Sequence, residues 1–190
     1  MALALTSAPA VEPVGLAEAK AHLRVDGDTE DDLIGALITA ARSWVERQYG
    51  LALISQGWSF YLDRVPGGGA VALPLGPLQS VESVTLHAED GGAAALDADD
   101  YAYDAISKPA RLIFKSVSGV ASLRRLNGIE IAYRCGFGDE AEDVPGPIRQ
   151  ALLLSIAHWF ERREPGVGAE PPEVPAMVAG LMAPYRQVRL

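Results

Sequence analysis

The spacing of apolar residues along the chain changes twice, from a helical period to a strand period and back again. Residues 16–23 place apolar and helix-favouring side chains at i, i+3, i+4 and i+7, which gathers them on one face of a short helix. A second, clearer helix follows an acidic interruption and ends at Tyr49, where Gly50 supplies the usual stop. Its broad apolar face consists of two adjacent stripes: Leu33, Leu37, Ala40 and Trp44, and Ile34, Ile38, Ala41 and Val45.

Polar residues mark the start of this second helix. Asp28 or Thr29 can accept hydrogen bonds from the free amides of the first turn, and the carboxylates that follow lie where the helix dipole favours negative charge. About twenty residues of helix extend over roughly 30 Å, so we expect this helix to span the body of the protein.

From Ser55 the apolar period changes to two. Trp58, Phe60 and Leu62 alternate with Ser59 and Tyr61, as on a strand with one buried face. Further short strand-like segments, separated by turn residues, follow at 70–73, 80–86, 101–103, 111–114 and 128–133. No helical pattern separates them, so we expect antiparallel pairing in a small sheet or barrel rather than parallel βαβ units.

The helical period returns after Asp143, where prolines are tolerated because a first helical turn leaves its amides unpaired anyway. This long helix carries its apolar residues on one face: Ile148, Leu152, Ser155, Ile156, Trp159 and Phe160. A short apolar helix is expected near 175–184.

The sequence therefore predicts an α+β fold. Two N-terminal helices, one long and one short C-terminal helix form a helical framework, and a small antiparallel β-sheet or barrel is inserted into it. We expect a single domain over residues 1–190. Its parts are a flexible N-terminal arm at 1–13, a β insert at 55–135, a linker at 164–175, and a C-terminal helix and tail at 176–190.

Composition narrows the class of protein. The chain has 190 residues, of which 49% are hydrophobic and 22% charged, as in globular proteins. It contains no apolar run near the ~20 residues that a membrane span requires, so we expect no membrane association. The single cysteine, Cys135, allows no intrachain disulfide and is expected to be a buried, small apolar residue. The net charge of −9 argues against binding nucleic acid over the whole surface, because that affinity comes from neutralised phosphates.

The sequence contains segments that resemble catalytic or metal-binding motifs, but each lacks residues that the motif requires. The acidic run from Asp26 resembles a calcium loop, but the required glycine and glutamate are replaced by Asp31 and Leu37. The glycines at 67–69 lack the Gly-Lys-Ser/Thr of a phosphate-binding loop. The histidines have no spacing for a shared metal: His22, His87 and His158. Arg124 and Arg125 are a weak nucleic-acid signal, and we expect them to be solvated. We expect no catalytic, cofactor or metal site, although an enzyme whose site assembles from distant residues remains an alternative.

Several short motifs occur in a characteristic order. They are PVGLAEAKAHLRVD at 13–26, DDLI at 31–34, AARSWVE at 40–46, LGPLQSV at 75–81, YRCGFG at 133–138, VPGPIRQA at 144–151, HWFER at 158–162 and LMAPYR at 181–186. Each is weakly specific, but together they resemble the head–tail connector (adaptor) proteins of long-tailed phages and gene transfer agents, from about Pro13 to the end.

This resemblance implies a structural protein of the virion or phage-like particle, assembled in the host cytoplasm and not an enzyme. Its subunits would form a ring, which we take to be dodecameric, beneath the portal protein at the head–tail junction. The ring would extend the DNA channel, pass DNA without sequence-specific binding, and receive a stopper or other tail-side protein. The alternatives are a stopper or tail-completion protein, or a small cytoplasmic enzyme with an unrecognised site.

Three groups of residues are candidates for assembly contacts. The first is an acidic cluster expected to face the channel or a neighbouring subunit: Asp26, Asp28, Glu30, Asp31 and Asp32. Residues 139–143 form a second such cluster, and a solvated surface is the alternative for both. Portal contact is expected from the basic tail, whose alternative is a frayed terminus: Tyr185, Arg186, Val188, Arg189 and Leu190. Ring or core packing is expected from Trp44, Trp159 and Phe160.

Overall fold

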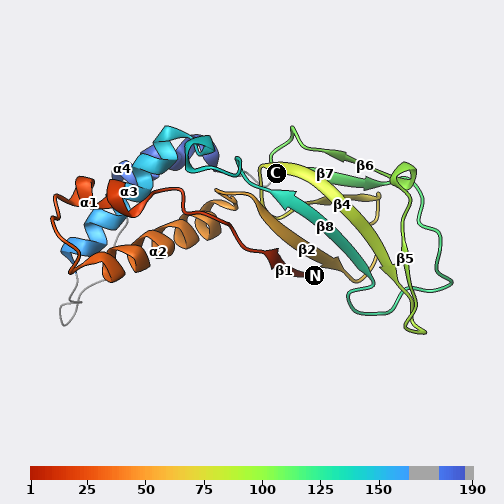
Figure 1. Ribbon diagram of the computed structural model, residues 1–190. Helices are drawn as coiled ribbons and strands as arrows, with labels where there is room; N and C mark the ends of the chain where they lie inside the picture. Colours follow the sequence, from red (N-terminus) through yellow and green to blue (C-terminus); the bar gives the residue numbers. More distant parts are fainter. Residues whose placement is uncertain (163–175, 187–190) are drawn as a thin grey trace, which may run out of the picture. The chain divides into compact units, whose positions relative to one another are not determined.

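The computed structural model describes residues 1–162 and 176–186, and these divide into two compact units. The helical unit comprises Ala10–Ile54 and Phe137–Arg186, and the β unit comprises Met1–Pro9 and Ser55–Gly136 (Figure 1). The segment Ser55–Gly136 of the β unit begins at the same residue as the predicted insert, 55–135. The predicted linker at 164–175 and the last four residues of the tail lie outside the described residues.

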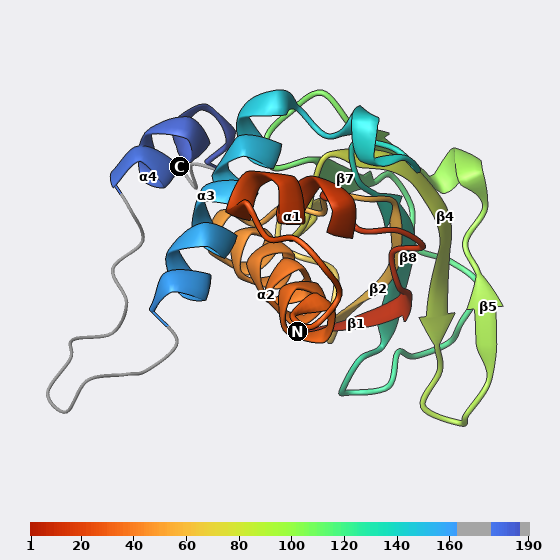
Figure 2. The ribbon, with the colours of Figure 1, turned by 60° about the vertical axis from the view of Figure 1, so that its left-hand side comes forward.

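The described part of the helical unit contains four α-helices: α1 (Leu16–Leu23), α2 (Asp31–Tyr49), α3 (Gly146–Glu161) and α4 (Ala176–Met182). Short 3-10 turns occur at Ala141–Asp143 and Ala183–Tyr185. In both views α4 lies beside α3 (Figures 1 and 2). The buried core draws on all four helices and includes Ala19, Ile34, Ile38, Ala41, Val45, Ile148, Leu152, Ile156, Val178 and Met182. Each large apolar side chain buried here contributes about 1.5–3 kcal/mol to stability.

Helix α2 corrects two details of the sequence prediction. The side chains of Asp28 and Thr29 do not cap its N-terminus. Glu30 is the N-cap residue, and no side-chain hydrogen bond caps the helix. A backbone turn forms the entry instead, with the amide of Asp31 donating to the carbonyl of Asp28 at 3.1 Å. Of the two predicted apolar stripes, the core takes Ile34, Ile38, Ala41 and Val45, whereas Leu33 remains 36% exposed. The predicted end is confirmed, since Gly50 adopts φ 69°, which favours glycine.

The β unit contains two open antiparallel sheets. The larger has the order β1-β2-β8-β4-β5, and the smaller has the order β3-β7-β6. The strands are β1 (Ala2–Ser7), β2 (Gln56–Leu62), β3 (Ala70–Ala72), β4 (Leu78–His87), β5 (Ala93–Ala95), β6 (Tyr101–Asp104), β7 (Arg111–Phe114) and β8 (Ile129–Cys135). The mixed α+β class and the antiparallel pairing are confirmed. The barrel alternative is wrong, because a closed barrel gives every strand two neighbours and these sheets end in edge strands.

Strand β1 forms where the sequence predicts a flexible arm. Residues 2–7 pair antiparallel with β2, from Ala2 opposite Tyr61 to Ser7 opposite Gly57. All six residues of β1 are exposed, and residues 2–5 are all apolar, so the segment lacks the apolar–polar alternation by which a half-buried strand is recognised in a sequence.

The central strand β8 orients the larger sheet. Ile129, Ile131, Tyr133 and Cys135 are buried on one face, and Glu130, Ala132 and Arg134 lie on the other. The flanking strands β2 and β4 continue this buried face with Phe60, Leu62, Val84 and Leu86, and the smaller sheet buries Leu112 and Phe114. Cys135 is buried within this face, as predicted.

Candidate assembly surfaces

The acidic cluster lies on the connection from α1 to α2. Asp26, Asp28 and Asp32 have exposed side chains, whereas Glu30 and Asp31 are half-buried. Asp31 is held by the chain itself, because Lys20 Nζ lies 2.5 Å from its Oδ1. The exposed carboxylates can present negative charge to a partner or to solvent. In the part of the chain that the structure describes, no three potential metal-ligating side chains are grouped to hold a metal ion.

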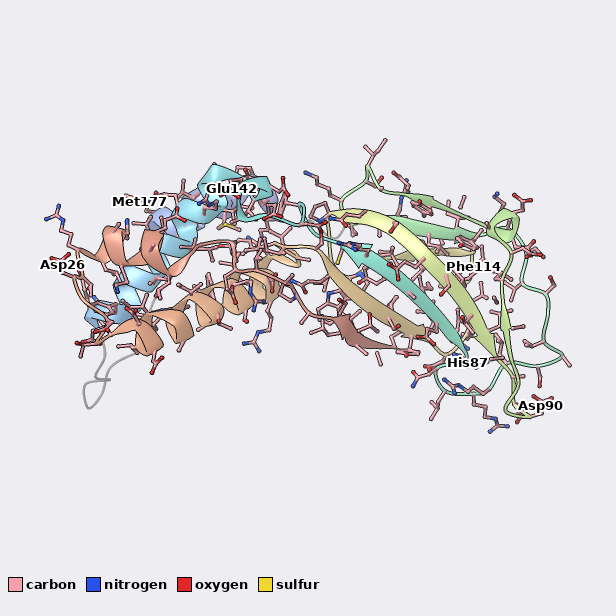
Figure 3. All side chains as sticks on the ribbon, viewed as in Figure 1. Asp26, His87, Asp90, Phe114, Glu142 and Met177 are labelled. Atoms are coloured by element: carbon pink, nitrogen blue, oxygen red, sulfur yellow. The ribbon has the colours of Figure 1, made fainter. Side chains whose placement is uncertain are left out.

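The second acidic cluster, at 139–143, has a partly structural role. The amide of Glu140 donates to Asp143 Oδ2 at 3.0 Å in a capping box that closes the turn before α3. Gly138 lies so close that a Cβ there would collide with the Asp143 carboxylate. Asp26 and Glu142 lie at different ends of the helical unit (Figure 3), so the two clusters form separate surfaces.

The predicted packing tryptophans meet within one chain. The rings of Trp44 and Trp159 contact edge to face, with centroids 6.4 Å apart and an interplanar angle of 87°. Tyr49 also contacts Trp44 edge to face, with centroids 6.2 Å apart. Phe160, like these three residues, is half-buried against the core. These aromatic residues therefore contribute to the core of the helical unit, and each leaves part of its ring at the surface.

The predicted portal-binding tail is only partly described. The ring of Tyr185 packs edge to face on Phe137, with centroids 6.4 Å apart, so this residue already has a partner in its own chain. Arg186 is exposed, and its amide donates to the carbonyl of Ala183 at 3.4 Å. Val188, Arg189 and Leu190 lie outside the described residues.

One ion-pair network was missed by the sequence prediction. Arg42 Nε and Nη2 donate to the Glu12 carboxylate at 2.7 and 3.1 Å, and Arg42 Nη1 donates to Glu46 Oε2 at 3.0 Å. Glu46 Oε1 accepts from the amide of Leu53 at 2.9 Å. Burial alone would lower the pKa of Arg42, but hydrogen bonds and attraction from Glu12 and Glu46 outweigh it and raise that pKa. The network ties both the segment before α1 and the segment after α2 to the α2 helix.

A polar network on the larger sheet was also missed. Glu130 Oε1 accepts from Ser59 Oγ at 2.7 Å and from Tyr61 Oη at 3.0 Å, and His87 Nε2 lies 3.1 Å from Glu130 Oε2. Burial raises the pKa of Glu130, but the hydrogen bonds from Ser59, His87 and Tyr61 outweigh it, so the pKa is lowered overall. Burial and the bond to Glu130 raise the pKa of Tyr61.

This network combines serine, histidine and glutamate, but its order does not suit nucleophilic catalysis. A hydrolytic triad places the histidine between the serine and the carboxylate, where it takes the hydroxyl proton. Here Glu130 stands in the middle, and Ser59 donates to the carboxylate rather than to His87. The arrangement stabilises the paired strands and does not activate a nucleophile.

Comparison with known proteins supplies the context for these surfaces. A protein-family model described as "Phage gp6-like head-tail connector protein" matches residues 14–117. Among solved structures, the chain is similar to a subunit in the neck of an empty gene transfer agent (GTA) particle computed with C6 symmetry, at a TM-score of 0.83 and 25% identity, covering 100% of this chain and 97% of that one. It is also similar to subunits of the virion of a native GTA particle (TM-score 0.81, 25% identity, 100% and 97% covered) and of the neck of a native GTA particle computed with C12 symmetry (TM-score 0.71, 25% identity, 98% and 97% covered). No curated protein matches the chain.

None of the described helices is both long enough and apolar enough to cross a membrane.

Proposed function

The chain belongs to the family of phage gp6-like head-tail connector proteins, and we infer from this that it is a structural head–tail adaptor of a tailed phage or phage-like particle. It lies at the head–tail junction of the particle and is not an enzyme. The observation that carries this inference is the similarity to the GTA neck subunit, which extends over both chains almost from end to end.

The adaptor works as an oligomeric ring associated with other components of the particle. We propose a dodecameric ring that contacts the portal protein on its head side and a stopper or other tail-side protein on its far side. The C12 symmetry used for one of the similar necks supports twelve copies. Twelve copies of a chain with net charge −9 would surround the channel with negative charge, so DNA would slide through without adhering.

The candidate residues take their proposed roles within this ring. The exposed carboxylates of Asp26, Asp28 and Asp32 suit the channel wall or a subunit boundary, where basic side chains of a neighbouring subunit can reach them. Arg186 is the described residue of the basic tail that is free to contact an acidic surface of the portal. The core of each subunit is packed against three half-buried aromatic side chains, whose exposed parts can contact the next subunit: Trp44, Trp159 and Phe160.

Removing the protein from its particle tests the proposed function. Particles assembled without the chain should contain filled heads that lack tails, because the tail has no docking ring. Supplying the intact chain in trans should restore tailed particles, and electron microscopy with a tagged chain should locate the tag at the neck. Tailed, infectious or gene-transferring particles assembled without the chain would refute the proposal.

A further inference from the structure

Strand β1 presents an open backbone edge on the larger sheet. It pairs with β2 on one side, and no described strand pairs with it on the other. About half of the amide and carbonyl groups of an edge strand point away from its neighbour and can pair with another chain. Its sequence, Ala-Leu-Ala-Leu-Thr-Ser, lacks the charged residues and prolines that usually block such edges. At six residues it is nearly as long as β2, so shortness does not protect it either.

An apolar row accompanies this edge. Leu3 and Leu5 are the register partners of Phe60 and Trp58, so they continue the apolar face of the sheet. Phe60 is 6% exposed, but Leu3 is 37% and Leu5 is 48% exposed. The covered part of the face therefore stops before β1. A strand added beyond β1 would satisfy its free backbone groups and cover the two leucines together.

The same unit offers a second edge with matching chemistry. Strand β6 pairs only with β7 among the described strands, and its four residues make it the longest other edge. Tyr103 lies opposite the buried Leu112, hence on the apolar face of its sheet, and is 45% exposed. The charged residue at the end of β6, Asp104, is already paired within the chain, because its Oδ2 accepts from Arg111 Nη2 at 2.9 Å. In Figure 1, β1 and β6 lie on opposite sides of the β unit.

We propose that β1 of one subunit pairs with β6 of the next subunit in the ring. A contact between two different surfaces of the same chain is head to tail, the kind of contact that closes a ring when the rotation between copies is repeated. Leu3 and Leu5 then lie beside Tyr101 and Tyr103 of the neighbouring copy, and each pair excludes water from the joined edge. The inference rests on the proposed ring and adds the surface through which its copies are joined.

Disulfide trapping tests this pairing. In a Cys135→Ala background, cysteines replace one leucine of β1 and one tyrosine of β6, in the four combinations of Leu3 or Leu5 with Tyr101 or Tyr103. Rings from purified protein or isolated particles are sized by native mass spectrometry and then oxidised. At least one combination should give a ladder of covalent multimers on a non-reducing gel. The matched control joins Leu3→Cys to Ala94→Cys on β5 and should give none.

The outcomes separate this inference from the proposed function. Rings of normal size that yield no ladder in any β1–β6 combination overturn the pairing and leave the adaptor function intact. Absence of any ring from intact particles overturns both. Where cysteines block assembly, Leu5→Lys decides, with Ile113→Lys as a control of similar exposure on β7. Leu5→Lys should weaken self-association at least about tenfold while circular dichroism stays unchanged, and normal assembly of this variant refutes the pairing.

Discussion

Replacing Arg42 with methionine should destabilise the helical unit by about 2–3 kcal/mol. The side chain is 13% exposed and makes three hydrogen bonds to the carboxylates of Glu12 and Glu46. Hydrogen bonds between charged groups contribute about 1.5–3 kcal/mol each when well shielded, and breaking a buried pair costs about 3–5 kcal/mol. The expected loss is smaller than the about 3–5 kcal/mol of a fully buried pair, because Glu12 is partly exposed and water screens its charge. Methionine retains most of the apolar stem, so the change reports on the guanidinium.

Urea unfolding followed by circular dichroism at 222 nm measures this loss, because that signal comes mainly from the helices. In thermal melts the same change corresponds to a decrease in Tm of roughly 5–10 °C for a chain of this size. Arg47→Met is the matched control, since Arg47 lies on the same helix with an exposed side chain, and it should change the free energy of unfolding by less than about 0.5 kcal/mol. If Arg42→Met unfolds within that same margin of the unmodified protein, the network does not hold the helical unit together.

Three further predictions follow from individual residues. The pKa of Glu130 is lowered in the folded protein, so its carboxylate contributes stability above the pKa that Glu130 has in the unfolded chain, and this stability is lost as pH falls through the folded pKa. Glu130→Gln should therefore flatten the acid side of the curve of stability against pH, measured by urea titration. Gly50→Ala should lower the free energy of unfolding by about 1 kcal/mol because φ is 69° there, whereas Gly35→Ala, in open space within α2, should raise it by about 0.5–1 kcal/mol. Substituting asparagine for the exposed acidic side chains should reduce DNA retention or ring yield in particle assays, and unchanged values would leave them as a solvated surface: Asp26, Asp28 and Asp32.

The sequence predicts most of the helical unit because its elements carry strong local patterns. Helix α2 combines a long apolar period with a terminal glycine, and both features survive in the structure. The entry to α2 could not be read in the same way. Asp28 is a competent cap in isolation, but its backbone carbonyl, rather than its carboxylate, meets the amide of Asp31. Side-chain preference and backbone turn compete at such positions, and the sequence alone does not decide between them.

Contacts between distant residues explain what the sequence analysis missed at the candidate surfaces. Arg42 and Glu46 are four residues apart on a helix, so their pairing is readable from spacing. Glu12 lies thirty residues from Arg42, and no local pattern connects the two. Strand β1 was missed for a different reason, because residues 2–5 are all apolar and give no alternation of apolar and polar residues.

Under the proposed pairing, the core of the helical unit serves folding and the β1 edge serves the joining of copies. Within the helical unit, apolar residues are buried in one core, the ion pair of Arg42 with Glu12 ties the segment before α1 to α2, and the ion pair of Arg149 with Glu18 joins α3 to α1. The β unit has a buried core as well, but among the described strands its edge strands pair on one side only, and Leu3, Leu5 and Tyr103 on two of them are partly exposed. Substitutions in the helical core should therefore change the free energy of unfolding, whereas those at β1 should change the association of copies and leave unfolding nearly unaltered.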